Sequence, residues 1–499
     1  MHELRKAVDD KYVGFKPESS SVKPVHIAMG VFKSILGECY TADGILRLSY
    51  VISSTGIIPK GNEPESIMQM LNTNNTIDNS EITEKQLAEF RSVLQKLVCA
   101  DNGVFPAKGK EMKKGMISYT AGSSYFVTPS GTNNIGIHED AGVFIGGLIK
   151  FYCPLLGNYI NKILREPNDA ISLIFEPVLS QGDPIPFLGL LAHQELSIFN
   201  TPNKNLKTFL NSIKESGECL KHQLENHPNK LTQLRLFILF CIYELERYMS
   251  LLESFYSDGE FRPILLDFTA DKKSSVSQTS GLCYSQFHKA ISRFYAWGFA
   301  QELSNMGFGK NELMLADVPI YDKNMDKGSK KYKKIHEELK PMWDITKKNI
   351  STMNDENALL EVGMSINDMI AIGATSHPIN YMRKLGTEVG LLYPPTNFHT
   401  DKRFILAEDI LESLLRCCIM PKETITSSEL RNRIYNRLGI IVGGTEEDSI
   451  RLKNIGSIVY ADTDALTQNY ELFSNVLQRM NFAEQLPDGI MQIRFGGYK

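Results

Sequence analysis

The sequence predicts a mainly α-helical protein with minor β structure (α+β), built from several domains. Three observations lead to this prediction. First, 499 residues exceed what one core usually holds, and roughly 150 residues per domain suggests about three domains. Second, apolar residues recur with helical spacing through the middle of the chain, from about residue 140 to residue 310. Third, the chain ends in a short hairpin that follows an amphipathic helix.

Residues 1–135 are predicted to form an N-terminal domain of mixed α and β structure. The runs VHIAMGVFKSIL and ILRLSYVISSTGIIP are each compatible with a strand or a buried helix, and periodicity does not decide between them. A capping-box pair, Thr83 and Gln86, precedes a helical stripe from Leu87 to Leu97. The lysine cluster KGKEMKKG and the Gly/Ser/Thr-rich stretch after it are typical of loops and edge structure.

Residues 136–321 are predicted to form a mainly helical middle domain. Its strongest helical segments are FIGGLIKFYCPLLGNYINKIL, LRLFILFCIYELERYMSLL and SQFHKAISRFYAWGFAQEL. The second of these begins at Leu234 and has only eight uncharged residues between Arg235 and Glu244. It is too short to span a bilayer and is typical of a buried core helix. FRPILLDFTAD and ELMLADVPIYD resemble short buried strands.

A lysine-rich stretch at 322–335 is predicted to link the middle domain to a helical connector at 336–400. It contains six lysines and no arginine. One interpretation is a solvated linker. The other is a loop that contacts phosphates, because clustered lysines bind phosphates without reading bases. The second interpretation uses four of these side chains, Lys330, Lys331, Lys333 and Lys334.

Residues 401–499 are predicted to form a winged-helix-like domain. In the final stretch FAEQLPDGIMQIRFGGYK, Asp488-Gly489 supplies the positive backbone dihedrals of a tight turn between two short strands. An amphipathic helix at about 464–480 precedes the hairpin. Thr426 and Glu429 form a capping box for an earlier helix, which ends at Gly439. About 24 residues separate the two helices where a winged helix has a compact turn.

Two kinds of partner are compatible with this C-terminal domain. Double-stranded DNA would meet polar side chains of the last helix and an arginine of the hairpin, namely Gln468, Asn469, Asn475, Gln478, Arg479 and Arg494. The charge balance favours a protein partner, because residues 426–499 carry eight basic and nine acidic side chains and the whole chain has a net charge of -4. Hairpin residues such as Ile490 or Phe495 would then make the contact.

Cysteine spacing and the N-terminal residues indicate where the protein resides. Eight cysteines are scattered along the chain without a C-x-x-C pair, which indicates reduced thiols and argues against a disulfide framework or a cysteine-rich zinc site. Cys417 and Cys418 occupy apolar helical positions and are predicted to be core residues. The N-terminal residues lack the apolar run of a signal peptide. We therefore expect a cytoplasmic protein that does not enter a membrane.

The sequence lacks the common catalytic and cofactor motifs. Neither G-x-x-x-x-G-K-[ST] nor G-x-G-x-x-G occurs, and neither does H-E-x-x-H or G-x-S-x-G. We therefore expect no cofactor, no resident metal and no catalytic residues. The alternative is a divergent metal-dependent nuclease, in which Asp267 or the cluster His138-Glu139-Asp140 holds a divalent ion.

From Tyr381 the sequence reads YMRKLGTEVGLLYPPTNFHTDKRFILAEDILESLLRCCI and continues into the winged-helix pattern. This segment, about the last 120 residues, resembles the C-terminal parts of accessory subunits from bacterial anti-phage defence operons. Those operons also encode FtsK/HerA-type DNA translocases, as in the phosphorothioation-dependent and methylation-associated systems. The resemblance implies a structural or DNA-engaging subunit, with a DNA translocase or a nuclease among its partner proteins.

Overall fold

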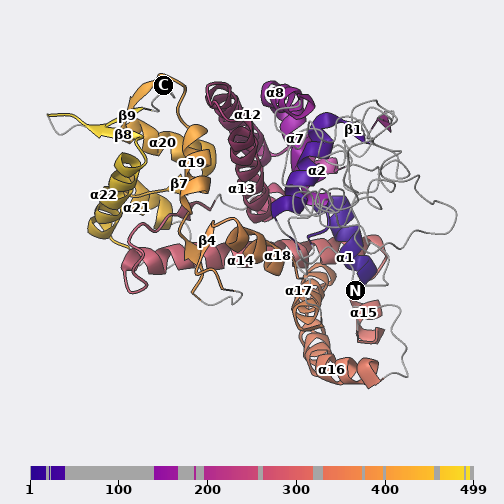
Figure 1. Ribbon diagram of the computed structural model, residues 1–499. Coiled ribbons are helices and arrows are strands. Elements are labelled where there is room, and N and C mark those ends of the chain that lie inside the picture. Colours follow the sequence, from indigo (N-terminus) through magenta and orange to yellow (C-terminus); the bar gives the residue numbers. More distant parts are fainter. Residues whose placement is uncertain are drawn as a thin grey trace, which may run out of the picture.

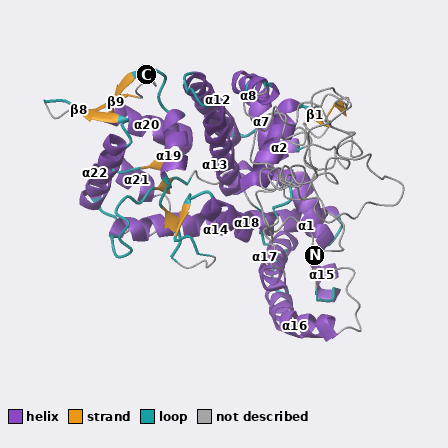
Figure 2. Ribbon diagram, in the orientation of Figure 1, coloured by secondary structure: helices purple, strands orange, loops and turns teal. Residues whose placement is uncertain are grey.

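The structure is a computed structural model, and it describes residues 2–17, 22, 24–39, 140–166, 185–186, 196–256, 262–318, 330–373, 377–396, 401–453, 461–487 and 491–494. Within these ranges the protein is mainly helical with few short strands, which confirms the predicted fold class (Figure 1, Figure 2). The helices are α1 (His2–Val8), the π-helical turn η1 (Asp9–Val13), α2 (Pro24–Leu36), α7 (Asp140–Tyr152), α8 (Pro154–Arg165), α11 (Ser197–Asn200), α12 (Lys204–Glu225), α13 (Lys230–Tyr256), α14 (Ser275–Asn305), α15 (Lys310–Leu315), α16 (Lys330–Ile350), α17 (Asp355–Gly373), α18 (Pro378–Glu388), α19 (Glu408–Arg416), α20 (Ser427–Leu438), α21 (Glu446–Lys453) and α22 (Thr463–Arg479). The strands are β1 (Glu38–Cys39), β2 (Ile185–Pro186), β3 (Ile264–Leu265), β4 (Leu392–Tyr393), β5 (Arg403–Phe404), β6 (Thr424–Thr426), β7 (Ile440–Ile441), β8 (Ala483–Gln485) and β9 (Met491–Arg494).

Helix α13 lies in the interior of the core. Apolar and aromatic residues occur on all its sides, and nearly every residue from Gln233 to Phe255 is buried. A helix that is hydrophobic all round is typical of an interior position, so the predicted core helix from Leu234 is confirmed. Helix α12 lies beside it (Figure 1), and Arg247 Nη1 of α13 donates to Ser212 Oγ of α12 at 2.9 Å.

The run VHIAMGVFKSIL, which the sequence left open between strand and helix, forms α2. This helix packs along α7, and the two backbones approach so closely that a Cβ atom at Gly142 would lie 2.2 Å from the Ile27 carbonyl oxygen. Ser34 Oγ donates to the Val143 carbonyl oxygen at 2.6 Å across the same contact. The packing partner, about 110 residues away in the sequence, supplies the stabilisation that local periodicity could not reveal.

Helices α7 and α8 correspond to one predicted segment, which breaks between Cys153 and Pro154. Pro154 opens the first turn of α8, where its missing N–H costs nothing. The two helix axes differ in direction by 119°. In the described part of the chain no single helix has the length and apolar composition needed to cross a bilayer, and α7 with α8 meets that test only as a bent pair.

Helices α16 and α17 form a hairpin at one edge of the molecule (Figure 1). Helix α17 packs against α14, where a Cβ atom at Gly363 would lie 2.1 Å from the Ala296 carbonyl oxygen. Trp343 of α16 is buried, and its Nε1 donates to the Ala316 carbonyl oxygen at 3.1 Å. The buried Trp343 indole and the close contact between Gly363 and Ala296 therefore help to fix the helix pair α16–α17 against the rest of the protein.

Gly363→Ala is expected to destabilise the folded chain by about 1–3 kcal/mol, because the new methyl group overlaps the Ala296 carbonyl oxygen and α14 and α17 must separate. Urea denaturation followed by circular dichroism measures this loss. Gly281→Ala, also within α14, is the matched control, because its new methyl group meets nothing closer than 3.5 Å. It should gain about 0.5–1 kcal/mol from helix propensity. Equal stability of the two variants would contradict the close approach.

The C-terminal hairpin that the sequence predicted is present as β8 and β9. Strand β9 pairs antiparallel with both β8 and β6, so the order of the sheet is β6-β9-β8. Ile493 of β9 is fully buried. The turn residues Asp488 and Gly489 lie outside the described residues, as do Ile490 and Phe495.

The N-cap at Thr426 and the C-cap at Gly439 of α20 are confirmed, but the Glu429 carboxylate pairs with Arg433 at 2.6 Å instead of completing the predicted capping box. Thr426 Oγ1 accepts from the Glu429 N–H at 3.2 Å, and Gly439 takes the left-handed conformation at a φ of 72°. The predicted last helix is α22, with Leu466 among the apolar residues on its buried face. Cys417 and Cys418 are buried as predicted, immediately after α19 ends.

The residues between α20 and α22 connect the C-terminal unit (residues 401–494) to the middle of the protein. They begin with β7, which pairs in parallel with β3, so the short strand predicted in FRPILLDFTAD is confirmed. Ile440 lies beside Ile264 in this pair. Next to it, the Tyr243 hydroxyl of α13 donates to the Leu438 carbonyl oxygen. Helix α21 follows β7, so the described residues between α20 and α22 do not form a compact turn.

Two local predictions differ from the structure. The segment ELMLADVPIYD does not begin as a strand, because its first residues belong to α15, where the Glu312 carboxylate accepts from the Gly309 N–H at 2.9 Å. The lysine-rich stretch is not linker throughout, because α16 begins at Lys330. The predicted helix from Leu87 to Leu97, with Thr83 and Gln86, lies outside the described residues. The domain boundaries remain predictions.

Candidate functional site

The candidate interface centres on α22. The Asp462 carboxylate caps this helix by accepting from the Ala465 N–H at 2.8 Å. Buried apolar residues then fix which side of the helix faces the core, and polar residues occupy the other side. Gln468 and Asn475 are exposed on that side, while Gln478 is half-buried.

Asn469 does not belong to the exposed side where the sequence placed it. Its side chain is fully buried, and Nδ2 donates to the carbonyl oxygens of Leu266 at 2.8 Å and Val442 at 2.9 Å. Its Oδ1 accepts from the Phe268 N–H at 2.8 Å. The prediction of Asn469 as a DNA contact is therefore wrong. The Asn469 amide lies beside the residues that follow β3 and β7, and it forms hydrogen bonds with their backbone carbonyl and N–H groups.

Arg479 and Arg494 each form an exposed ion pair within the chain. Arg479 Nη2 lies 2.6 Å from Glu408 Oε1 of α19, and Arg494 Nη2 lies 2.7 Å from Glu484 Oε2 of β8. All four side chains are more than half exposed, so each pair contributes little to stability. A phosphate that approached either arginine would also meet a carboxylate.

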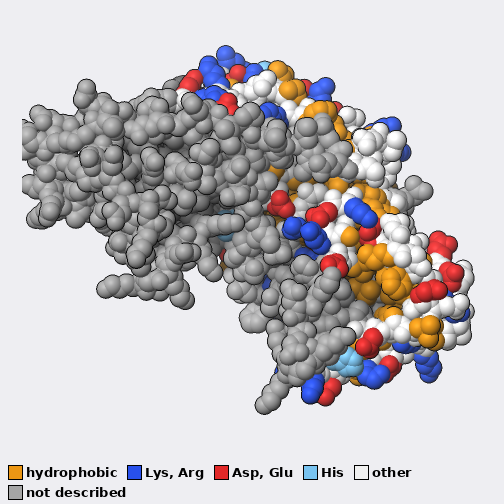
Figure 3. Space-filling model, turned by 90° about the vertical axis from the view of Figure 1, so that its right-hand side faces the viewer, with side chains coloured by type: hydrophobic (Ala, Val, Ile, Leu, Met, Phe, Trp, Pro, Cys, Tyr) orange, Lys and Arg blue, Asp and Glu red, His pale blue; other side chains and the backbone are white. Residues whose placement is uncertain are grey.

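The structure does not bring the four predicted lysines to α22. They lie at the start of α16, far from α22 in Figure 1. Lys333 and Lys334 are exposed, and Lys334 faces Glu338 at 3.9 Å, whereas the side chains of Lys330 and Lys331 lie outside the described residues. On the described part of the face in Figure 3, basic and acidic side chains are interspersed. The two predicted sets of DNA contacts therefore do not form one surface.

Asp267, the ligand suggested for the nuclease alternative, is held by protein groups. Its side chain is fully buried, and Oδ1 accepts from the Thr269 N–H at 2.9 Å and the Thr269 hydroxyl at 2.6 Å. Oδ2 accepts from the Ser277 hydroxyl and from Arg403 Nε at 3.0 Å. The Ala270 N–H also donates to Oδ1 at 3.3 Å, so five donors surround a carboxylate that offers about four acceptor positions. Asp267 therefore connects β3, α14 and β5 and has no position left for a metal ion.

The second suggested metal cluster falls mostly outside the described residues. His138 and Glu139 lie there, and Asp140 begins α7. Over the ranges that the structure describes, no group of three or more His, Cys, Asp or Glu side chains could hold a metal ion.

An open polar groove of about 540 Å³ lies between α14 and the chain around β5. Ser277, Tyr284 and His288 of α14 line one wall, and Lys402 and Arg403 line the other. Burial, followed by the charge of Arg383, lowers the pKa of Lys402 to about 8. No sequence signal indicated this groove, because its walls are more than a hundred residues apart in the chain.

The two cationic side chains of the groove's second wall, Lys402 and Arg403, already bond to other groups of the protein. Lys402 Nζ donates to Thr387 Oγ1 at 3.0 Å and to the Thr396 carbonyl oxygen at 2.8 Å. Arg403 holds Asp267 and stacks on the Tyr393 ring at 5.1 Å. The groove is therefore polar without a large excess of positive charge.

No protein-family model matches the sequence, and no curated protein matches it either. Function must therefore be inferred from the residues themselves.

Proposed function

We propose that this chain is a non-catalytic structural subunit of a bacterial multiprotein, DNA-associated assembly of the anti-phage defence type. The observation that carries the proposal is the order of elements in the C-terminal unit: α19, β6, α20, α22, β8 and β9, with β7 and α21 inserted between α20 and α22 and a sheet in the order β6-β9-β8. That order is the one expected of a winged helix, a module that binds either DNA or another protein. The resemblance from Tyr381 onward supports a partnership with a DNA translocase or a nuclease.

The charge pattern supports a protein partner for this unit. Each exposed arginine of the predicted interface has a carboxylate within 2.7 Å, so a phosphate would have to displace Glu408 or Glu484. Other arginines of the unit are engaged in the same way, as Arg433 is with Glu423 at 2.7 Å. A DNA-binding surface usually presents an excess of positive charge. Protein docking needs no such excess.

Purification of the tagged full chain from its native operon tests this proposal. A stable complex with a translocase or nuclease chain is expected, and recovery of the chain alone under several salt conditions would contradict the proposal. Truncation of the hairpin is unsuitable for this experiment. Strand β9 is the middle strand of its sheet and buries Ile493, so its removal would disrupt the fold itself.

Simultaneous replacement of Arg479 and Arg494 by alanine is expected to leave duplex binding by the isolated chain unchanged. If both arginines neutralised phosphates, the slope of log affinity against log salt would fall by about two. Fluorescence anisotropy over a salt series measures this slope. The matched control replaces Arg165 and Arg293, which are also exposed and pair elsewhere in the chain with the half-buried carboxylates of Glu38 and Glu253. A fall in slope for the first variant alone would favour direct DNA contact over protein docking.

A further inference from the structure

A carboxyl group without an ion-pair partner lies in the interior, on α13. The side chain of Glu246 is only 7% exposed, and its Oε1 lacks a hydrogen-bond partner. The neighbouring cation, Arg247, is engaged elsewhere, because Nη1 bonds to Ser212 and to Glu244 at 3.3 Å. Among the described residues no salt bridge involves Glu246. Burial raises the pKa of this carboxyl well above its usual value, an effect that the backbone N–H of Gly386 only partly opposes.

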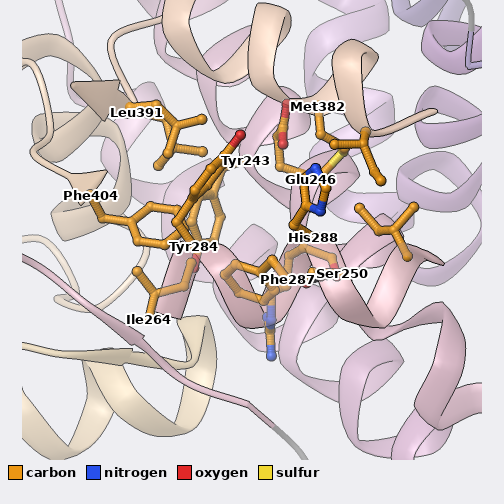
Figure 4. A pocket seen from close by; sticks show the side chains of 14 residues that line it. Tyr243, Glu246, Ser250, Ile264, Tyr284, Phe287, His288, Met382, Leu391 and Phe404 are labelled. Carbon is orange, nitrogen blue, oxygen red and sulfur yellow. Dashed lines mark hydrogen bonds between the residues drawn. The ribbon is translucent and has the colours of Figure 1, made fainter. Parts of the chain in front are cut away.

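Glu246 lines a small cavity of about 30 Å³ (Figure 4). The other walls are mainly apolar and aromatic, and include Phe287 and Phe404. The Tyr284 hydroxyl is a second buried group without a hydrogen-bond partner. Figure 4 shows Glu246 beside His288 and across the cavity from Phe404. The volume suffices for one water-sized group with polar contacts.

This inner cavity adjoins the polar groove. Tyr284 and His288 line both spaces, so the two side chains form the boundary between them. The groove, at about 540 Å³, has the size of small-molecule sites, which commonly measure about 300–1,000 Å³. A ligand can therefore place its body in the groove and one small end group beside Glu246.

We propose that this site binds the primary ammonium group of a small organic amine. The ammonium nitrogen is the size of a water molecule and fits the inner cavity. The Glu246 carboxylate supplies the opposite charge, the Tyr284 hydroxyl oxygen accepts a hydrogen bond, and the aromatic side chains of Phe287 and Phe404 complete the wall. The carbon chain of the amine then extends past Tyr284 toward the groove. No bond is made or broken beyond the proton that leaves the Glu246 carboxyl when the ammonium binds.

Other ligand classes fit these groups less well. An anion would face the Glu246 carboxyl in an apolar cavity. A divalent metal ion prefers several carboxylate or imidazole ligands, and no suitable group of three occurs in the described residues. A bound water satisfies the hydrogen bonds but offers no opposite charge, so it does not favour ionisation of Glu246. An ammonium group satisfies both the charge and the hydrogen bonds.

The titratable groups around Glu246 determine which side chain releases a proton when a ligand binds. Burial raises the pKa of Tyr284 to about 12, and that of Tyr381 on α18 lies well above its usual value. Both phenols stay neutral at pH 7. The remaining ionisable groups are His288 and the cation Arg247, which both line the cavity, and Arg383, whose charge acts on Tyr284. Burial favours the neutral carboxyl of Glu246 and a bound ammonium favours its carboxylate, so binding should lower the pKa of Glu246 and release protons from it.

Calorimetric titration of the full chain with n-propylammonium tests the proposal. The uncharged analogue 1-propanol, of the same chain length, should bind at least about 30-fold more weakly, and Glu246→Gln should weaken n-propylammonium by a similar factor. Glu253→Gln is the matched control, because Glu253 is a carboxylate of the same helix that pairs with Arg262 and Arg293 and does not line the cavity. Titration in two buffers of different ionisation enthalpy reports the released proton, which should vanish in Glu246→Gln.

Three results would overturn the proposal. Equal binding of n-propylammonium and 1-propanol would show an apolar site that ignores charge. Unchanged binding by Glu246→Gln would place the ammonium elsewhere. Absence of any heat or thermal shift up to high millimolar amine would mean that the cavity holds water only. Thermal unfolding of each variant confirms folding, and Tyr284→Phe provides a second variant that should weaken binding if Glu246→Gln misfolds.

Discussion

Asp267→Ala is expected to lower the free energy of unfolding by about 3–5 kcal/mol, because it leaves the buried Arg403 guanidinium without its carboxylate. The two side chains are buried, and Arg403 Nε lies 3.0 Å from Oδ2. The same substitution strands the Thr269 N–H and the Ser277 hydroxyl, which both donate to this carboxylate. Urea denaturation of the purified variant measures the loss.

Asp401→Ala is the matched control for this experiment. Asp401 also pairs with a cation, Lys272 at 2.6 Å, but both side chains are at least half exposed, so loss of the pair should cost no more than about 1 kcal/mol, and alanine at the left-handed φ of 65° about 1 kcal/mol more. The double variant Asp267→Ala, Arg403→Met should recover part of the loss, since no unpaired charge then remains buried. A stable Asp267→Ala protein that had lost a Mg²⁺-dependent cleavage of plasmid would instead favour the nuclease alternative.

Local patterns in the sequence were sufficient to predict those helices and strands whose structure depends on neighbouring residues. The Thr426 cap and the left-handed Gly439 are set by neighbouring residues, so α20 could be bounded correctly. The apolar run from Leu234 is long and continuous, and it forms α13 as expected. The hairpin was predicted for the same reason, because strand propensity and turn residues occur within one short stretch.

The features that organise the candidate sites depend on distant residues and could not be read locally. Asp267 and Arg403 are 136 positions apart, and neither neighbourhood indicates the other. The parallel pair of β3 and β7 likewise joins segments from two predicted domains. Glu246 is one charged residue within an apolar helix, and only the packing of α14 and α18 around it shows that it borders a cavity. These contacts depend on how the chain folds, and the residue types alone do not predict them.

Asn469 illustrates the same limit, because helical position alone placed it beside Gln468 on the polar side. In the structure it satisfies three backbone groups: the carbonyl oxygens of Leu266 and Val442 and the N–H of Phe268. These groups come from two different segments that meet under α22. One side chain therefore joins the last helix to both strands of the β3-β7 pair, and its amide offers both the donors and the acceptor that this requires.

Asn469→Ala is accordingly expected to lower the free energy of unfolding by about 3–5 kcal/mol, because each stranded buried backbone group costs about 1–3 kcal/mol. Gln468→Ala, the adjacent exposed residue, should change it by no more than about 0.5 kcal/mol. Amide hydrogen exchange gives a second readout: the Phe268 N–H should lose protection in Asn469→Ala and keep it in Gln468→Ala. If Asn469→Ala instead kept full stability while duplex binding fell, the residue would act at a nucleic-acid surface and its assignment to the core would be wrong.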